Sequence, residues 1–142
     1  MPLHVNILAI LVAVVANFII QMVWYTALFA KPWMKEMGYD PNMRPDKKAM
    51  FKGMALSFIS SFLFAWVLAF YLAGWKYIPG ATEMTPLVTG INSAISVWVG
   101  FFVPVQLSRV VWEKHSWKLF FINSGYHFLA TLVVSLVLSC WS

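Results

Sequence analysis

Four long apolar stretches run along the chain, and short polar connections separate them. The stretches cover residues 5–30, 51–73, 86–111 and 119–141. About 20 residues in helical conformation cross the ~30 Å hydrocarbon core of a bilayer, so each stretch is long enough to span it. The pattern predicts an all-α integral membrane bundle of four transmembrane helices, with residues 1–142 forming a single domain.

Prolines and charged residues set the expected helix ends. The first stretch exceeds a signal-peptide core and no basic leader precedes it, so we expect it to be retained as a helix. Pro32 cannot continue the ladder of this helix, although residues 32–37 can add one turn at the membrane surface. Pro86 suits the first turn of the third helix, and Pro104 predicts a kink inside that helix.

One face of the fourth helix is polar in an otherwise apolar stretch. It holds Asn123, Tyr126, His127, Ala130 and Val134, which follow helical spacings of three and four. Each of the other helices carries a comparable stripe of small and polar residues. These stripes are Ala9, Ala13, Asn17, Gln21 and Tyr25; Gly53, Ser57, Ser60, Ser61 and Phe64; and Asn92, Ser96, Gly100, Pro104 and Ser108. Because small residues let helices approach and polar ones bond across them, we predict that these faces meet around the fourth helix.

The depths of the polar residues agree between helices. At 1.5 Å per residue, Asn17 and His127 each lie about 12 Å from the inner membrane edge, and Gly100 lies near that level. The sequence therefore predicts one polar layer, comprising Asn17, Gln21, Ser60, Ser61, Asn92, Ser96, Asn123, Tyr126 and His127. These groups serve either as interhelical hydrogen bonds, worth ~0.6–2 kcal/mol each, or as a binding site; the first interpretation is favoured.

A weak internal repeat is also possible. The first helix carries Asn17 and Trp24, and the third carries Asn92 and Trp98 at similar spacing. Two such pairs also arise easily by chance, so both explanations stay open.

Composition and charge placement support a membrane location. Hydrophobic residues make up 61% of the chain and charged residues 11%, against about 45–50% and 25% in soluble domains. The net charge of +5 is concentrated in two connections, which argues against nucleic-acid binding. The positive-inside rule places residues 31–52 and 112–118 in the cytoplasm. We therefore expect a bacterial inner-membrane (cell-membrane) protein with both termini outside and the lipid bilayer as its immediate partner.

Titratable chemistry inside the predicted helices is limited to one histidine. No acidic or basic residue lies deep in a helix, which disfavours ion-coupled transport. His127, with a reference pKa of ~6.5, is the one such group that could change charge near neutrality. It is either a neutral imidazole bonded to Asn17, Tyr126 or a hydroxyl, or a group that handles protons or binds a ligand. A metal or haem role is least favoured, because His4 and His115 fall at other levels.

Known catalytic patterns do not occur in the sequence. We find no hydrolase triad, phosphate loop, zinc signature or dinucleotide fingerprint, and we predict no cofactor and no metal site. The single cysteine, Cys140, excludes an intrachain disulfide and favours a packing role.

Three sequence segments resemble a known family. They are Val23-Trp24-Tyr25-Thr26-Ala27-Leu28-Phe29-Ala30-Lys31-Pro32-Trp33-Met34, Val97-Trp98-Val99-Gly100-Phe101, and Lys118-Leu119-Phe120-Phe121-Ile122-Asn123-Ser124-Gly125-Tyr126. In this order they resemble the small bacterial membrane family catalogued as domain of unknown function 1761. Pro32 and Ser124 depart from the expected small or variable residues. The resemblance implies a four-helix membrane protein and carries over no catalytic residue.

Three functional classes follow from these features. The leading hypothesis is a non-enzymatic structural or assembly component, either a homo-oligomer or a subunit of a larger membrane complex. The first alternative is a small membrane enzyme that acts on an apolar or quinone-like molecule, with His127, Tyr126 and Asn17 around the substrate. The second is a channel or small-solute exporter at an oligomer interface, because four helices enclose little volume.

Overall fold

The computed structural model describes residues 5–38, 46–75, 77–79 and 84–141, and all regular elements in these ranges are helical. Four helical spans in the described part are long and apolar enough to cross a membrane: Ile7–Leu28, Lys47–Trp75, Pro86–Trp112 and Trp117–Trp141. The predicted all-α fold with four such helices is confirmed. His4 and residues 39–45 of the predicted 31–52 connection lie outside the described residues.

The first span consists of α1 (Ile7–Met22) and a π-helical segment, η1 (Val23–Leu28), and α2 (Ala30–Met37) follows it. The Asn6 side chain caps α1 by accepting hydrogen bonds from the amides of Leu8 and Ala9. The first span ends at Leu28, and Phe29 lies between η1 and α2. Pro32 lies in the first turn of α2, where its missing amide needs no partner. The turn predicted over residues 32–37 is therefore part of a separate eight-residue helix.

The second span is α3 (Lys47–Trp75), which extends past the predicted 51–73 at both ends. The third span consists of α4 (Pro86–Val97), a π-helical segment η3 (Trp98–Phe102) and α5 (Val103–Trp112). Pro86 begins α4 as predicted, next to the capping side chain of Thr85. In place of a simple kink, the wider turn of η3 precedes Pro104, which then occupies the first turn of α5.

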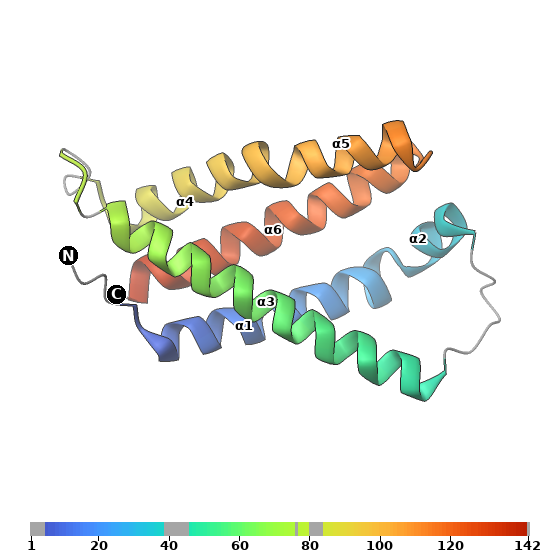
Figure 1. Ribbon diagram of the computed structural model, residues 1–142, viewed down its shortest axis with the longest axis horizontal. Coiled ribbons are helices and arrows are strands. Elements are labelled where there is room, and N and C mark those ends of the chain that lie inside the picture. Colours follow the sequence, from blue (N-terminus) through green and yellow to red (C-terminus); the bar gives the residue numbers. More distant parts are fainter. Residues whose placement is uncertain (1–4, 39–45, 76, 80–83, 142) are drawn as a thin grey trace.

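The fourth span, α6 (Trp117–Trp141), is the centre of the bundle, as predicted. Half of its most apolar window is buried, against 28% or less in the other three spans. It packs along both α1 and α4, while α3 packs mainly on α1 (Figure 1). Both described ends of the chain lie at one end of the bundle, and α2 and the α5–α6 junction lie at the other (Figure 1).

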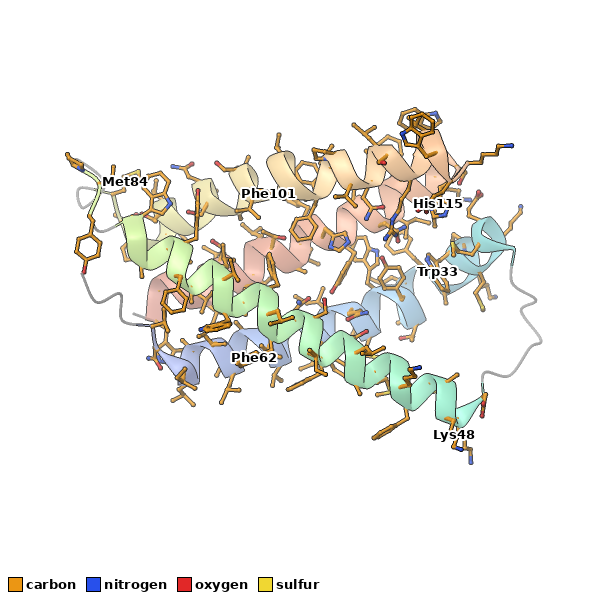
Figure 2. All side chains as sticks on the ribbon, in the orientation of Figure 1. Trp33, Lys48, Phe62, Met84, Phe101 and His115 are labelled. Carbon is orange, nitrogen blue, oxygen red and sulfur yellow. The ribbon has the colours of Figure 1, made fainter. Side chains whose placement is uncertain are left out.

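Apolar side chains cover the outside of the bundle. Phe101 is 69% exposed at mid-length, whereas Trp33, Lys48 and His115 lie at the end with the basic connections (Figure 2). Large apolar residues are exposed on all four spans. Such a surface suits the hydrocarbon core of a bilayer.

The stripe predicted to pack inward is correct for the first span and wrong for the third. Ala9, Ala13 and Asn17 are buried in α1. In the third span, the stripe of Asn92, Ser96, Gly100, Pro104 and Ser108 is exposed, and the buried line consists of Gly90, Ser93, Ala94, Val97 and Gln106. Both faces carry small residues at helical spacing, so the pattern did not distinguish them. The contact with α6 shows which face is buried, because the Ser135 hydroxyl of α6 donates to the Gly90 carbonyl at 2.7 Å.

Candidate functional site

A buried amide connects three of the four spans. The Asn17 side-chain nitrogen donates to Ser61 Oγ of α3 at 3.1 Å, and its oxygen accepts from the Tyr126 hydroxyl of α6 at 2.7 Å. All three side chains are buried. Both ends of the Asn17 amide are therefore used to join α1, α3 and α6 at one level.

A second polar connection lies closer to the basic connections. The Tyr25 hydroxyl of η1 donates to Asn123 Oδ1 of α6 at 2.7 Å, and its ring lies 5.4 Å from that of Tyr126. Gln21 donates to Ser57 Oγ of α3 at 3.4 Å. The first span thus bonds to α3 and to α6 at successive turns.

Two tryptophans donate to the backbone of α6. The indole nitrogen of Trp24 lies 3.0 Å from the Ile122 carbonyl oxygen, and that of Trp98 lies 2.9 Å from the Ser124 carbonyl oxygen. A Cβ at Gly125 would meet the Trp24 ring at 3.1 Å, so glycine allows this close approach. Each indole belongs to the start of a π-helical segment. The first and third spans therefore contact α6 in equivalent ways.

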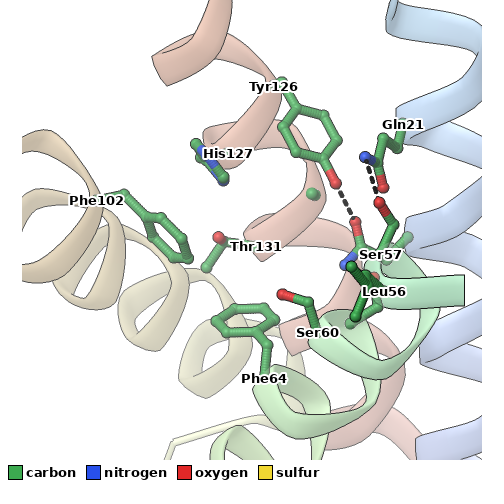
Figure 3. A pocket seen from close by; sticks show the side chains of 12 residues that line it. Gln21, Leu56, Ser57, Ser60, Phe64, Phe102, Tyr126, His127 and Thr131 are labelled. Carbon is green, nitrogen blue, oxygen red and sulfur yellow. Dashed lines mark hydrogen bonds between the residues drawn. The ribbon is translucent and has the colours of Figure 1, made fainter. Parts of the chain in front are cut away.

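A pocket of about 370 Å³ opens beside the Asn17 network. Side chains of α1, α3, α6 and η3 form its walls (Figure 3). The lining residues are Asn17, Gln21, Leu56, Ser57, Ser60, Ser61, Phe64, Phe102, Tyr126, His127, Ala130 and Thr131. None of them is acidic or basic apart from the imidazole, so the pocket is polar without carrying a fixed charge.

His127 contacts the aromatic wall of the pocket. Its ring is parallel to that of Phe102, with centroids 4.5 Å apart and an interplanar angle of 17°. Among the described residues, His127 has no hydrogen-bond partner. The neighbouring Tyr126 hydroxyl donates to Asn17 instead. The expected bond of His127 to Asn17, Tyr126 or a hydroxyl is therefore not formed. Successive residues of a helix point about 100° apart, so Tyr126 faces α1 while His127 faces η3.

Thr131 is a pocket residue that the sequence analysis missed. Its side chain is 1% exposed, and its hydroxyl has no hydrogen-bond partner in the described part of the chain. It lies four residues after His127 and so shares its face, a spacing that could have identified it. Ser57, Phe64 and Phe102 were also not predicted as site residues, because only the packing of helices brings them together.

The other predicted polar residues lie outside the pocket. Asn123 is buried and bonded to Tyr25. Asn92 is exposed, with its amide nitrogen 3.9 Å from Met84 Sδ, and Ser96 is exposed on the same outer face. Among the described residues, no group of three or more His, Cys, Asp or Glu side chains is placed to hold a metal ion.

The fold and pocket define a class: a helical protein with four membrane-span helices and a polar pocket between them. The model of the family described as "Protein of unknown function (DUF1761)" matches residues 8–139, nearly the whole chain. The chain belongs to this family, which confirms the resemblance seen in its sequence. Searches of curated proteins and of solved structures found no match.

Proposed function

We propose that this protein is a multi-pass membrane protein that binds a small, uncharged, amphipathic molecule between its spans. The pocket carries the proposal: it has a volume of about 370 Å³ and polar groups from three spans. Binding sites for small molecules have volumes of about 300–1,000 Å³ and combine apolar walls with a few polar groups. A polar space inside a membrane bundle is expensive unless something occupies it.

Apolar packing closes the end of the bundle that holds the described chain ends, which argues against a pore through one protomer. Apolar residues of three spans pack there, and all of them are 7% exposed or less: Ile10, Val14, Leu68, Leu72, Val134 and Leu138. Transport would therefore use an interface between protomers. The enzyme alternative would use the same pocket, but a binding role requires no charged catalytic group.

Photolabelling of the full-length protein in phosphatidylcholine nanodiscs tests this proposal. The probe is a decanol that carries a photoactivatable diazirine, and mass spectrometry locates the label. Leu56 lines the pocket and is 56% exposed, so Leu56→Trp should fill the pocket without disturbing the core. Leu63 is 51% exposed on the same helix outside the pocket, and Leu63→Trp is the matched control.

We expect labelling of the pocket residues of α3 and α6 in the wild type and in Leu63→Trp, and its loss in Leu56→Trp. Labelling confined to the lipid-facing surface, with no difference between the two tryptophan variants, would refute the proposal.

A homo-oligomer or membrane-complex subunit is the second candidate, and a different observation favours it. Asn92, Ser96 and Ser108 are exposed on the outer face of the third span, where polar side chains favour helix–helix contacts. Cysteine cross-linking tests it: Ser96→Cys in a Cys140→Ala background should form a covalent dimer in membranes. Ile95→Cys, exposed at the same level of the span but about 100° around the helix from Ser96, should not. Equal yields would refute a specific contact.

We also propose a bacterial inner-membrane location, with the basic connections in the cytoplasm and both termini outside. The placement of lysine and arginine supports it. Lys48→Cys in the Cys140→Ala background should resist a membrane-impermeant maleimide in intact cells and react after permeabilisation. Reaction in intact cells would contradict this orientation and place the basic connections outside.

A further inference from the structure

The pocket contains a small set of hydrogen-bonding groups that the fold does not use. Asn17, Gln21 and Tyr126 donate within the protein. Thr131 is buried with an unpartnered hydroxyl, and Ser60 and His127 have no hydrogen-bond partner among the described residues. A buried hydroxyl without a partner is destabilising by about 1–3 kcal/mol. These groups therefore identify where a ligand would form its polar contacts.

The unused groups lie on two facing walls. Thr131 and His127 are one turn apart on α6, with Cβ atoms about 5–6 Å apart at this spacing. Ser60 belongs to α3, and its hydroxyl faces the same space as Thr131 (Figure 3). Each of these side chains can donate a proton: two hydroxyls and one imidazole N–H. A ligand with two acceptors on opposite sides would satisfy both walls at once.

Aromatic rings shape the rest of the pocket. Phe102 is stacked on His127, and the Phe64 ring lies 5.4 Å from the Phe102 ring at 71°. Such walls pack well against a flat ring, by stacking on one side and edge contact on the other. A flexible polar head would leave these faces poorly filled.

The absence of fixed charge from the pocket lining excludes ionic ligands. No lysine, arginine, aspartate or glutamate lines the pocket, so a phosphate, carboxylate or ammonium group would be buried without a counter-ion. Leu56 lines the pocket and is also 56% exposed on the outside of the bundle. An apolar tail can therefore leave past Leu56 while an uncharged head stays inside.

We propose that the pocket binds the ring of a lipophilic quinone. One carbonyl oxygen accepts from Thr131 and His127 on α6, and the opposite carbonyl accepts from Ser60 on α3. The ring packs against Phe64 and Phe102, and the tail passes Leu56 into the lipid. This assignment names the ligand class of the proposed binding function and rests on it.

Competition against the photoactivatable decanol tests the ligand class. The competitors are decylubiquinone, a quinone with a ten-carbon tail, and 1-decanol, which has the same tail and a single hydroxyl. We expect decylubiquinone to halve pocket labelling at a concentration at least tenfold below that of 1-decanol. Thr131→Val is nearly isosteric and removes only the hydroxyl; it should raise that concentration about tenfold, the effect of losing one hydrogen bond.

Two further variants make the comparison specific. Ser60→Ala should weaken decylubiquinone about fivefold and 1-decanol less, because the single hydroxyl of 1-decanol can bond to Thr131 and His127 on α6 instead. Ser93 also has a buried hydroxyl without a partner, but it lies outside the pocket. Ser93→Ala should therefore leave both competitors unaffected. Size-exclusion profiles identify any variant that does not fold. Ser60 is exposed, so Ser60→Ala should fold and tests the quinone assignment independently of Thr131→Val.

The outcomes separate the two levels of the proposal. If the decanol probe labels the pocket but decylubiquinone competes no better than 1-decanol, the binding function stands and the quinone assignment fails. The assignment also fails if Thr131→Val and Ser60→Ala compete like the wild type. If neither molecule occupies the pocket, both proposals fail.

Discussion

The two halves of the bundle are built differently. In the half that contains the described chain ends, the spans meet through apolar side chains such as Ile10, Val14 and Val134, all fully buried. In the half near the basic connections, the contacts are hydrogen bonds and aromatic rings, such as Asn17 with Tyr126 and Phe102 with His127. One half is closed, and the other contains the pocket.

The difference follows from how helices associate in lipid. Lipid tails are as apolar as leucine, so helices are held by close packing or by interhelical hydrogen bonds. Small residues such as Ala13 and Ala65 bring backbones together. Long polar and aromatic side chains hold them farther apart. The buried residues of α3 begin only at Ser61, so its first half contributes little to the core and borders the open half.

The largest expected effect is a clash in the closed half. A Cβ at Gly90 would lie 2.5 Å from Ser139 Oγ and 3.0 Å from Leu136 Cδ2. Gly90→Leu should separate α4 from α6 and destabilise the protein by about 3 kcal/mol or more. Thermal unfolding in detergent, followed by size exclusion, measures it. Gly53→Leu, where nothing lies within 4 Å, is the control; equal losses would contradict the packing argument.

Removing the Asn17 amide should have the next largest effect. Asn17→Leu leaves the Tyr126 hydroxyl without its acceptor and Ser61 without its donor, for an expected loss of about 2 kcal/mol. Tyr126→Phe should cost about half of that. In a double-mutant cycle the two losses should not add, because they remove the same bond. Strict additivity would show that the bond contributes nothing to stability.

A smaller loss is expected at the contact between η1 and α6. Trp24→Phe removes the indole donor to the Ile122 carbonyl and should cost about 1 kcal/mol. Trp98→Phe removes the equivalent donor to the Ser124 carbonyl. It should lower the stability by about the same amount if the two tryptophan contacts with α6 are equivalent. Chemical denaturation in detergent compares them. A loss confined to one tryptophan would contradict this equivalence.

No loss of stability is expected in the pocket itself. Thr131→Val removes a buried hydroxyl that has no partner and keeps the shape of the side chain, so without ligand the stability should rise by about 1 kcal/mol, the low end of the cost of burying an unpaired hydroxyl. Thermal unfolding of the delipidated protein tests this expectation. A large loss would mean that the hydroxyl supports the fold, and it would remove the pocket from consideration as a site.

Hydrophobic periodicity and proline placement were enough to predict the four spans and the central position of α6. They also identified Asn17, Ser61 and Tyr126 as residues of one layer, because depth along a helix follows directly from residue number. The direction in which a side chain points around a helix is less certain when two faces look alike. This is why the stripe of Asn92 and Ser96 was placed inside and lies outside.

The sequence by itself determined that the chain forms four apolar helices, that polar groups share a level, and to which family it belongs. Only the tertiary structure decided which groups are paired and which are left over. A hydrogen bond depends on a few tenths of an ångström between residues distant in sequence, such as Asn17 and Tyr126. The unpartnered Thr131 hydroxyl and the pocket beside it arise because those pairings are completed without it.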